Sequence, residues 1–486
     1  MTSSQSWWEA PANPPPEEGK APNLDFAKMD PETVPEDTEE LLTRRVHLLG
    51  TGSIGTLVAH SLMVLPNPPP LTLLIHRPEL YEDFKAGDRV VRLVNKNTDV
   101  NDEQRGYDVD VIERDAERVT WQHIPHVLPP SEGDGRMNRL NEAEKMESGE
   151  VFIYTLIVTV KGPATVVALR SVQHRVDQRT TILLMQNGMG QIDDLNRLVF
   201  TNPNTRPTYM LGVISHGCYM QGPFAIVHAG FGTVALGIYR DTDKYPLPPK
   251  GDDINTSTLS ETDRKAMFPT DKDLYSNLSS RYLLRTLTRS PVLACAAYPY
   301  LDLFQLQLEK LVSNCVLNPL TALLNVQNGA MLNNPHLTRV QRLLIVEISL
   351  VIRGLPELEG IPNARTRFSP ARLETLFEGI VNKTAKNSSS MREDVRKLLY
   401  TEVDYINGYI VNRGEQQGIK CVLNYMIMEL VKARSFHDRE SSSASLPNEH
   451  DSEPVATFQP RGAVSIMEAE RQGDAVVLED TGKPAS

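Results

Sequence analysis

Hydrophobic and polar positions alternate along the first half of the chain in blocks that predict strands and helices in succession. Short apolar runs, each long enough for a buried strand, occupy residues 46–49, 71–75, 151–160 and 180–185. Residues 56–65, between the first two runs, have the apolar spacing of a helix. Strands that alternate with helices form a parallel sheet covered on both faces, so we expect a doubly wound, Rossmann-type α/β domain.

The second half of the chain has a different pattern. From about residue 301 the apolar positions recur with helical spacing, which predicts an all-α domain. We therefore place a Rossmann-type domain at residues 41–300 and a helical domain at residues 301–436. Polar stretches at about residues 101–148 and 240–272 interrupt the first domain, and we interpret both mainly as insertions.

The two ends of the chain have a composition that disfavours folding. Residues 1–40 are rich in Pro and Glu and hold ten acidic against two basic residues, and residues 437–486 are rich in Ser and charged residues. Such segments bury too little apolar surface to order themselves, so we expect two disordered tails. The first tail also lacks the basic and apolar regions of a signal peptide, and its acidity is unlike that of a mitochondrial presequence.

Charge and cysteine content restrict the class of protein. The net charge of −12 argues against general nucleic-acid binding, which needs a basic face. No apolar run reaches the roughly 18 residues of a membrane span. The four cysteines form no C-x-x-C pair, so we expect neither a disulfide framework nor a metal site. These features predict a cytoplasmic protein, with a mitochondrial location as the alternative.

A glycine-rich turn directly after the first apolar run predicts a dinucleotide site. Gly50-Thr51-Gly52-Ser53-Ile54-Gly55 is a complete G-x-G-x-x-G between a strand and a helix. The first glycine permits a tight turn, the second lets the backbone approach a pyrophosphate, and the third allows close packing of helix and strand. The helix N-terminus then faces the phosphate charge. The alternative is an ordinary glycine turn.

Three polar residues follow other expected strands, at the sheet edge where ligands of open α/β folds bind. Residues 71–75 are followed by His76-Arg77, where an NAD enzyme usually carries an acid. A cation there suits the 2′-phosphate of NADPH, but nearby Glu79 and the reading of Arg77 as a surface residue leave the cofactor open. Lys161 and Asn187 follow the next two strands and are candidates to contact cofactor or substrate. Taken alone, Lys161 would be interpreted as a surface charge and Asn187 as a turn residue.

Lys310, Asn314 and Asn318 recur every four residues in a mostly apolar segment, so they share one face of a buried helix. An unpaired buried amide costs about 1–3 kcal/mol, so these side chains need partners. A polar substrate would supply them, and a polar network between helices is the alternative. Pro319 disfavours helix at Asn318, so we expect a kink or a helix end there.

A second polar segment, residues 387–408, contains Ser390 and Glu402. Ser390-x-x-Glu393 predicts a capping box that begins a helix, and a helix N-terminus is also a site for a carboxylate. Glu402 by itself is typical of an exposed acid in a first helical turn. Neither residue identifies a function alone.

Together these motifs resemble the ketopantoate reductase family. The similarity lies in residues 50–55, 161–162, 187–190, 310–322, 325–329 and 389–408. It spans roughly residues 45 to 435 outside the two insertions. The resemblance implies a two-domain enzyme that reduces 2-dehydropantoate to pantoate with NADPH, on the route to pantothenate and coenzyme A. It also implies an active site in the cleft between the domains.

The resemblance assigns roles on the substrate side. It implies that Lys310 is the general acid that protonates the keto oxygen as hydride arrives. Glu402 would bind a substrate hydroxyl and help to hold Lys310. Asn314 and Asn318 would orient the substrate, and Ser390 would hold its carboxylate. A lysine suits proton donation if its pKa is lowered.

On the cofactor side, the resemblance places Asn187 at the nicotinamide end of NADPH, Lys161 near it and Arg77 at the 2′-phosphate. The expected partner is a small 2-oxo acid, with neither nucleic acid nor membrane, and a homodimer is left open. Two alternatives are a reductase of another branched 2-oxo acid and a non-catalytic relative that acts as a binding or regulatory module. Intact Lys310 and Glu402 disfavour the second.

Overall fold

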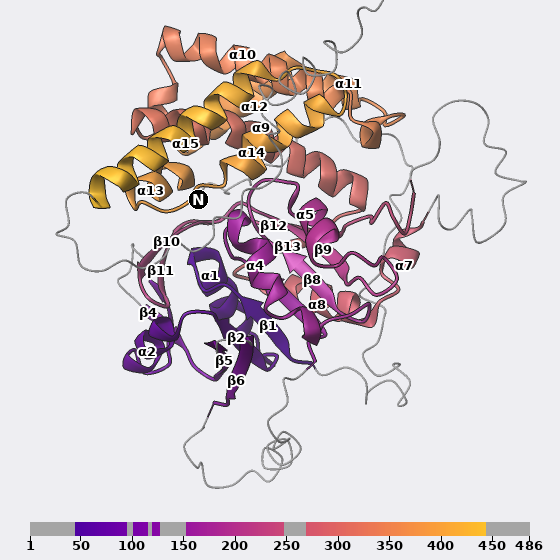
Figure 1. Cartoon of the computed structure of the whole chain (residues 1–486), viewed down its shortest axis with the longest axis vertical. Helices are drawn as coiled ribbons and strands as arrows, with labels where there is room; N and C mark the ends of the chain where they lie inside the picture. The colour runs from indigo at the N-terminus through magenta and orange to yellow at the C-terminus, as the bar shows by residue number, and fades with distance from the viewer. Residues whose placement is uncertain (1–43, 95–100, 115–118, 127–151, 247–268, 444–486) are drawn as a thin grey trace, which may run out of the picture.

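The structure is a computed structural model, and it describes residues 44–94, 101–114, 119–126, 152–246 and 269–443. An α/β part formed by the N-terminal residues lies beneath a helical part formed by the C-terminal residues (Figure 1). This arrangement confirms the predicted fold class. No helix among the described residues is long and apolar enough to span a membrane.

A nine-stranded sheet forms the centre of the N-terminal part, in the order β13-β12-β9-β8-β7-β1-β2-β5-β6. Its strands are β1 (Val46–Leu49), β2 (Leu71–Ile75), β5 (Tyr107–Arg114), β6 (Val119–Ile124), β7 (Thr155–Val158), β8 (Thr181–Leu184), β9 (Thr208–Ile214), β12 (Val234–Ile238) and β13 (Cys295–Ala297). The six strands from β9 to β5 are parallel. From β1 the chain runs outward to β2 and later returns to β7 on the other side of β1. Ligands of such sheets bind at the carboxyl ends of strands where this reversal occurs.

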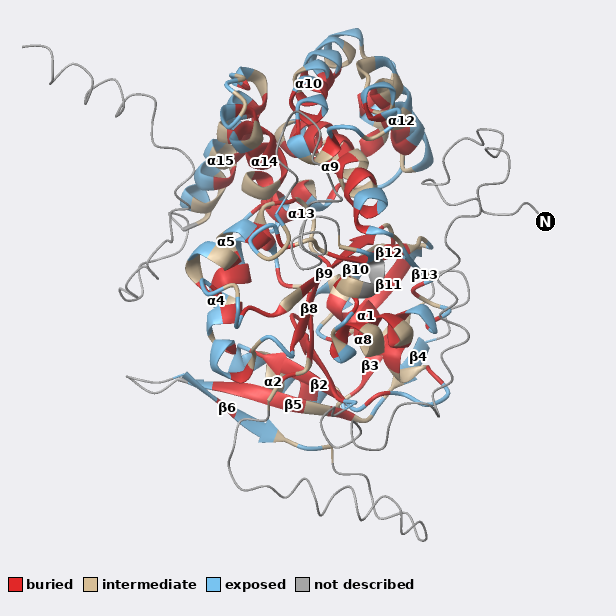
Figure 2. Cartoon of the chain, turned by 90° about the vertical axis from the view of Figure 1, so that its right-hand side faces the viewer, coloured by how far each residue is buried: buried red, intermediate tan, exposed pale blue. Residues whose placement is uncertain are grey.

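Side chains alternate across this sheet as the pleat requires. Leu48 and Leu73 belong to the apolar core on one face, whereas their neighbours Leu49 and Leu74 belong to the core on the other. The helices of the N-terminal part are α1 (Ser53–Met63), α2 (Pro78–Ala86), α4 (Thr165–Arg170), α5 (Gln191–Leu198), α7 (Asp271–Leu274) and α8 (Leu278–Thr288). Buried residues follow the strands and the inward faces of the helices (Figure 2).

A smaller sheet packs beside α1, with the order β10-β11-β3-β4. Its strands are β3 (Val91–Val94), β4 (Asn101–Gln104), β10 (Gly217–Gly222) and β11 (Ala225–Gly230). The hairpin β10–β11 connects β9 to β12, so its two ends lie beside the carboxyl end of β9.

The C-terminal part is built around one long helix, α9 (Tyr300–Leu324), which is buried along most of its length. Around it lie α10 (Pro335–Arg353), α11 (Ala364–Arg367), α12 (Pro370–Lys383), α13 (Ser390–Arg396), α14 (Val403–Glu415) and α15 (Val422–Ser443). Helices α10, α12, α13, α14 and α15 all contact α9. One apolar core includes Ile214 of the sheet and Leu308, Leu311 and Val316 of α9, so the two parts are joined by continuous packing.

Of the two outcomes expected at Asn318, a kink or a helix end, the helix end is wrong, because α9 continues past Pro319 to Leu324. Proline has no N–H, so it leaves the carbonyl of Cys315 without its helical donor. The side-chain amide of Asn407 fills this role, with Nδ2 2.9 Å from the Cys315 oxygen. A donor supplied by a neighbouring helix thus removes part of the cost of the proline.

The polar stretch at 101–148 is not mainly an insertion in its first part, since it supplies β4, β5 and β6. Two acids of β5 are paired with arginines: Asp108 with Arg45, and Asp110 with Arg175 at 2.8 Å. Residues 127–151 and most of the stretch at 240–272 lie outside the described residues, as do residues 1–43 and 444–486. The expected start of the second tail at residue 437 is wrong, because α15 extends to Ser443.

Candidate active site

The glycine turn packs closely at two of its glycines and leaves open space at the third. A Cβ on Gly50, whose φ is +105°, would lie 2.7 Å from the Val160 nitrogen, and one on Gly55 would lie 1.9 Å from the Gly50 oxygen. A Cβ on Gly52 would meet no atom within 4 Å, so this glycine borders open space. Gly52 is the N-cap of α1 and no side chain caps the helix. The first amides of α1 are therefore free to donate to an anion.

Arg77 stands where the chain leaves β2, as the N-cap residue of α2. Its side chain is exposed, and its guanidinium has no hydrogen-bond or ion-pair partner among the described residues. Glu79 lies in the first turn of the same helix. An unpaired guanidinium can accept a phosphate without first breaking a salt bridge.

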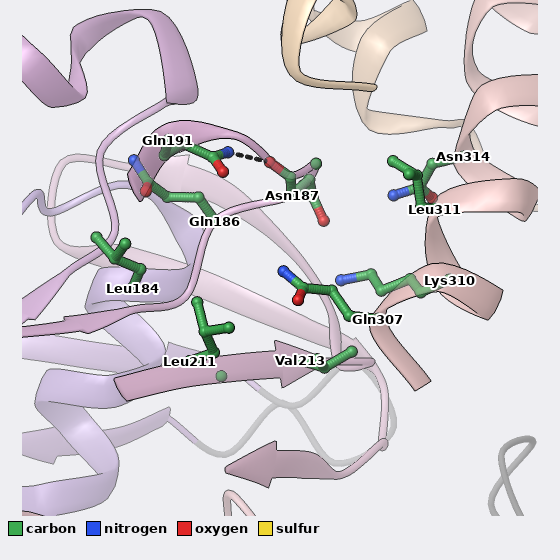
Figure 3. A pocket seen from close by; sticks show the side chains of 12 residues that line it. Leu184, Gln186, Asn187, Gln191, Leu211, Val213, Gln307, Lys310, Leu311 and Asn314 are labelled. Carbon is green, nitrogen blue, oxygen red and sulfur yellow. Dashed lines mark hydrogen bonds between the residues drawn. The ribbon is translucent and has the colours of Figure 1, made fainter. Parts of the chain in front are cut away.

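Lys310 and Asn187 line the same pocket from opposite sides. The pocket lies at the carboxyl ends of β8 and β9 and also includes Gln307 and Asn314 of α9. Figure 3 shows the side chains of Gln307 and Lys310 extending from α9 toward the loop that contains Asn187. Residues about 120 positions apart in sequence therefore meet where the resemblance expects a substrate and the nicotinamide.

The ammonium group of Lys310 donates a hydrogen bond to the backbone carbonyl of Ile214, at 2.7 Å. Burial lowers the pKa of Lys310 to about 8, against the opposing effect of the Glu402 carboxylate, which raises it. A lysine with this pKa is mostly protonated at neutral pH and releases its proton more readily than a solvated lysine. It is thus suited to act as a general acid.

Glu402 is buried, which differs from the exposed first-turn acid that its sequence position suggests. Only 4% of the residue is exposed, and it is the N-cap of α14. Its Oε1 accepts from the backbone N–H of Gly162 at 3.0 Å, and its Oε2 accepts from Nδ2 of Asn187 at 3.2 Å. These bonds bring together the two strand-end loops that the sequence singled out.

Lys161 donates to Asp394 of α13 at 2.8 Å, and its Nζ lies 3.7 Å from Glu402. Burial lowers the pKa of Lys161, but the carboxylates of Glu402 and Asp394 outweigh it and raise the pKa above its usual value. Lys161 is therefore a cation held between Asp394 and Glu402. Asp394 was missed by sequence reasoning, although it lies four residues after Ser390 and so shares a helix face with it.

Asn314 and Asn318 continue the stripe from Lys310 along α9. Asn318 is 5% exposed, and neither side-chain amide has a hydrogen-bond partner among the described residues. A ligand with polar groups would satisfy them.

Ser390 is exposed and is the first residue of α13, but it is not the cap. Ser389 caps the helix instead, because its Oγ accepts from the Arg392 N–H at 3.2 Å. The predicted capping box of Ser390 and Glu393 is therefore wrong, although a helix begins at Ser390 as expected. Since the cap role belongs to Ser389, the hydroxyl of Ser390 remains available to a ligand.

Tyr405 of α14, also missed by sequence reasoning, fits between the two strand-end loops. A Cβ on Gly162 would lie 2.8 Å from its ring, and one on Gly188 would lie 2.3 Å from its carbonyl oxygen. That oxygen accepts from the N–H of Met189 at 2.7 Å, and the tyrosine hydroxyl donates to Asp194 at 2.9 Å. The glycines after Lys161 and Asn187 are thus explained by the close approach of the helical part.

Comparison with known proteins gives matches over both parts of the chain. Residues 46–241 match the family model "Ketopantoate reductase PanE/ApbA", and residues 302–435 match "Ketopantoate reductase PanE/ApbA C terminal". A "Probable 2-dehydropantoate 2-reductase" of Schizosaccharomyces pombe is 27% identical over 396 residues, which are 81% of this chain and 97% of the relative. A "2-dehydropantoate 2-reductase" of Salmonella typhimurium is 28% identical over 60% of this chain and 77% of the relative.

A "Ketoisovalerate reductase BEA2" of Gibberella fujikuroi is also similar, with 24% identity over 76% of this chain and 78% of the relative. Among solved structures, a PanE/ApbA family ketopantoate reductase from Ralstonia eutropha has a TM-score of 0.52 at 18% identity, covering 81% of this chain and 99% of that structure. This last likeness concerns the fold alone.

Proposed function

The chain belongs to the ketopantoate reductase family, and from this premise we propose that it reduces 2-dehydropantoate to pantoate with NADPH as the hydride donor. The observation that carries the proposal is the meeting of Lys310 and Asn187 in one pocket, with Glu402 bound to Asn187 beside it. Residues from distant parts of the sequence, among them the proposed proton donor Lys310, therefore lie together.

The residues of the N-terminal part fit a dinucleotide phosphate. The open space at Gly52 and the uncapped N-terminus of α1 suit the pyrophosphate. The unpaired Arg77 suits the additional 2′-phosphate, which is the basis for proposing NADPH over NADH. Asn187 and Lys161 would lie near the nicotinamide end. When bound, the dihydronicotinamide supplies the hydride.

Lys310 performs the proton transfer of the reaction. Hydride addition at C2 of the 2-oxo acid breaks the C=O π bond and leaves its electron pair on oxygen. The proton on Nζ of Lys310 passes to that oxygen, which yields the hydroxyl of pantoate and a neutral lysine. The lysine then regains a proton from water. Its pKa of about 8 keeps the donor mostly protonated at neutral pH and makes it a stronger acid than a solvated lysine.

Polar groups of the helical part bind the rest of the substrate. Ser390 would donate to the carboxylate, and the free amides of Asn314 and Asn318 would orient the oxygen atoms. The Glu402 carboxylate already accepts two hydrogen bonds, but its two oxygens offer roughly four acceptor positions. A remaining position can accept from the C4 hydroxyl of 2-dehydropantoate.

The similarity to a ketoisovalerate reductase favours a second candidate function, reduction of a 2-oxo acid without that hydroxyl. The two candidate substrates differ in the hydroxyl group that Glu402 would bind. A site built to bind a hydroxyl can reject an analogue that lacks it by up to about 10⁴–10⁵, because a buried polar group is left unpaired. Loss of Glu402 should therefore reduce the preference for 2-dehydropantoate over 2-oxoisovalerate.

An assay of the purified full chain tests the proposal. NADPH and NADH oxidation are followed with 2-dehydropantoate, 2-oxoisovalerate and pyruvate as substrates. We expect the highest kcat/KM with 2-dehydropantoate and NADPH. Higher kcat/KM with 2-oxoisovalerate would establish the second function, and NADPH binding without reduction of any 2-oxo acid would favour a non-catalytic binding module.

A further inference from the structure

Two buried histidines lie near the backbone carbonyl of Ile214, which accepts the hydrogen bond from Lys310. His216 is 7% exposed and lies in the turn between β9 and β10, two residues after Ile214. His228 of β11 is 8% exposed, and its Nε2 lies 3.0 Å from Nδ1 of His216. Neither histidine lines the pocket that contains Lys310.

The hydrogen bonds of His216 define its tautomer. Its Nδ1 accepts from the backbone N–H of Gly232 at 3.1 Å, so this nitrogen carries a lone pair. Its Nε2 therefore holds the proton and donates to the carbonyl of Leu293 at 2.9 Å. His228 must then donate through Nε2 to the same lone pair of His216. This assignment rests on the hydrogen-bond network.

These bonds join the Ile214–Gly217 turn to the chain that enters β12. Ser215 strengthens the junction, since its backbone N–H donates to the Thr233 carbonyl at 3.0 Å and its Oγ accepts from the Thr233 N–H at 2.7 Å. A Cβ on Gly232 would lie 2.4 Å from Oγ of Ser215, so the two segments are in close contact. The backbone carbonyl of Ile214 accepts from Lys310. The segment that contains this carbonyl is therefore held in place by the side chains of His216 and Ser215, which lie outside the pocket.

We propose that His216, supported by His228, is a positioning residue for Lys310: it fixes the Ile214 carbonyl that orients the lysine ammonium. The inference rests on the proposed function, because it assigns a role within the same reaction. A carbonyl that accepts from an ammonium stabilises the charged form, so its displacement lowers the pKa of the lysine. A displaced proton donor also slows the chemical step.

The surroundings of both histidines favour the neutral form of the ring. Burial lowers the pKa of His216, and burial together with the neighbouring His216 lowers that of His228 to about 4. His60 of α1 faces His228, and burial also lowers the pKa of His60, against the opposing effect of Asp102. Glu402 is the charged group that raises the pKa of Lys310. A change in the kcat profile at alkaline pH therefore reports the pKa of Lys310.

The test compares His216→Leu, which removes all three contacts, with His216→Asn, whose amide oxygen can replace Nδ1 as the acceptor. We expect His216→Leu to lower kcat about 10- to 100-fold while the Kd for NADPH changes little. The alkaline limb of its kcat profile should move to lower pH by about one unit, the effect of losing one hydrogen bond to a charged group. His216→Asn should recover part of both losses. His437→Leu, on the exposed surface of α15, is the matched control.

A measurement without turnover separates this proposal from the proposed function. The pKa of Lys310 is read from the pH dependence of its acetylation by acetic anhydride, followed by mass spectrometry, and it should fall in His216→Leu even if the substrate is misassigned. If His216→Leu does not fold, His228→Leu, which keeps the Leu293 and Gly232 contacts, takes its place. A folded variant with a lower melting temperature but an unmoved Lys310 pKa and pH profile would overturn the proposal.

Discussion

Replacing Lys310 is the most informative perturbation of the proposed mechanism. A positioned general acid contributes about 10²–10⁴ in rate, which corresponds to about 2.7–5.4 kcal/mol of transition-state stabilisation. Lys310→Ala should therefore lower kcat on 2-dehydropantoate by about this factor. The Kd for NADPH should stay nearly unchanged, because the glycine turn and Arg77 belong to the other part of the chain.

The dependence of kcat on pH tests the role of Lys310 in a second way. Reduction needs the protonated lysine, so activity is present below the pKa of about 8 and is lost as pH rises through it. A single group with this pKa gives about a tenfold fall in kcat between pH 7 and pH 9. Lys310→Ala should lack this limb, and so should Lys310→Arg, whose guanidinium keeps the charge but does not release a proton in this range.

The unmutated protein and the Lys310 variants are compared by steady-state kinetics over a range of pH. NADPH binding is measured separately by fluorescence titration. Lys383→Ala, a substitution on the exposed surface of α12, serves as the control and should behave as the unmutated protein. Retention of near-normal turnover by Lys310→Ala would refute the reasoning. So would an alkaline limb that persists unchanged in that variant, because another group would then supply the proton.

Three further predictions follow from the same geometry. Arg77→Ala should raise the KM for NADPH while leaving that for NADH nearly constant, and equal use of both cofactors by the unmutated protein would contradict the 2′-phosphate assignment. Glu402→Gln should shift the alkaline limb to lower pH, since Glu402 raises the Lys310 pKa, and should reduce the preference for 2-dehydropantoate over 2-oxoisovalerate; an unchanged preference would exclude the hydroxyl contact. Gly188→Ala should lower the free energy of unfolding by about 2–5 kcal/mol, from its positive φ and overpacking against Tyr405. Gly222→Ala, where a Cβ meets nothing within 4 Å, should be far milder in thermal unfolding, and equal losses would refute the packing argument.

The sequence predicts features whose cause is local. The strand, glycine turn and helix at residues 46–63 depend on neighbouring residues, and the structure has them where the pattern indicates. The four-residue spacing of Lys310, Asn314 and Asn318 also places them on one helix. Their common face is a property of the helix alone.

The local pattern of residues does not predict features that depend on distant partners. Glu402 has the sequence context of an exposed acid, and its burial comes from Gly162 and Asn187, more than 200 positions away. Pro319 indicates a helix end by local rules, but a donor from Asn407 lets the helix continue. In the sequence, Asp108 and Asp110 of β5 look like part of a polar loop, because their arginine partners lie on other segments.

Transfer of deuterium tests the central claim most directly. The purified chain is incubated with NADPH that carries two deuterium atoms at C4 of its nicotinamide and with 2-dehydropantoate, and the product is analysed by mass spectrometry. We expect pantoate with one deuterium at C2, formed at a rate that falls by about 10²–10⁴ in Lys310→Ala. Absence of labelled pantoate from the unmutated protein, while the cofactor is bound, would contradict it.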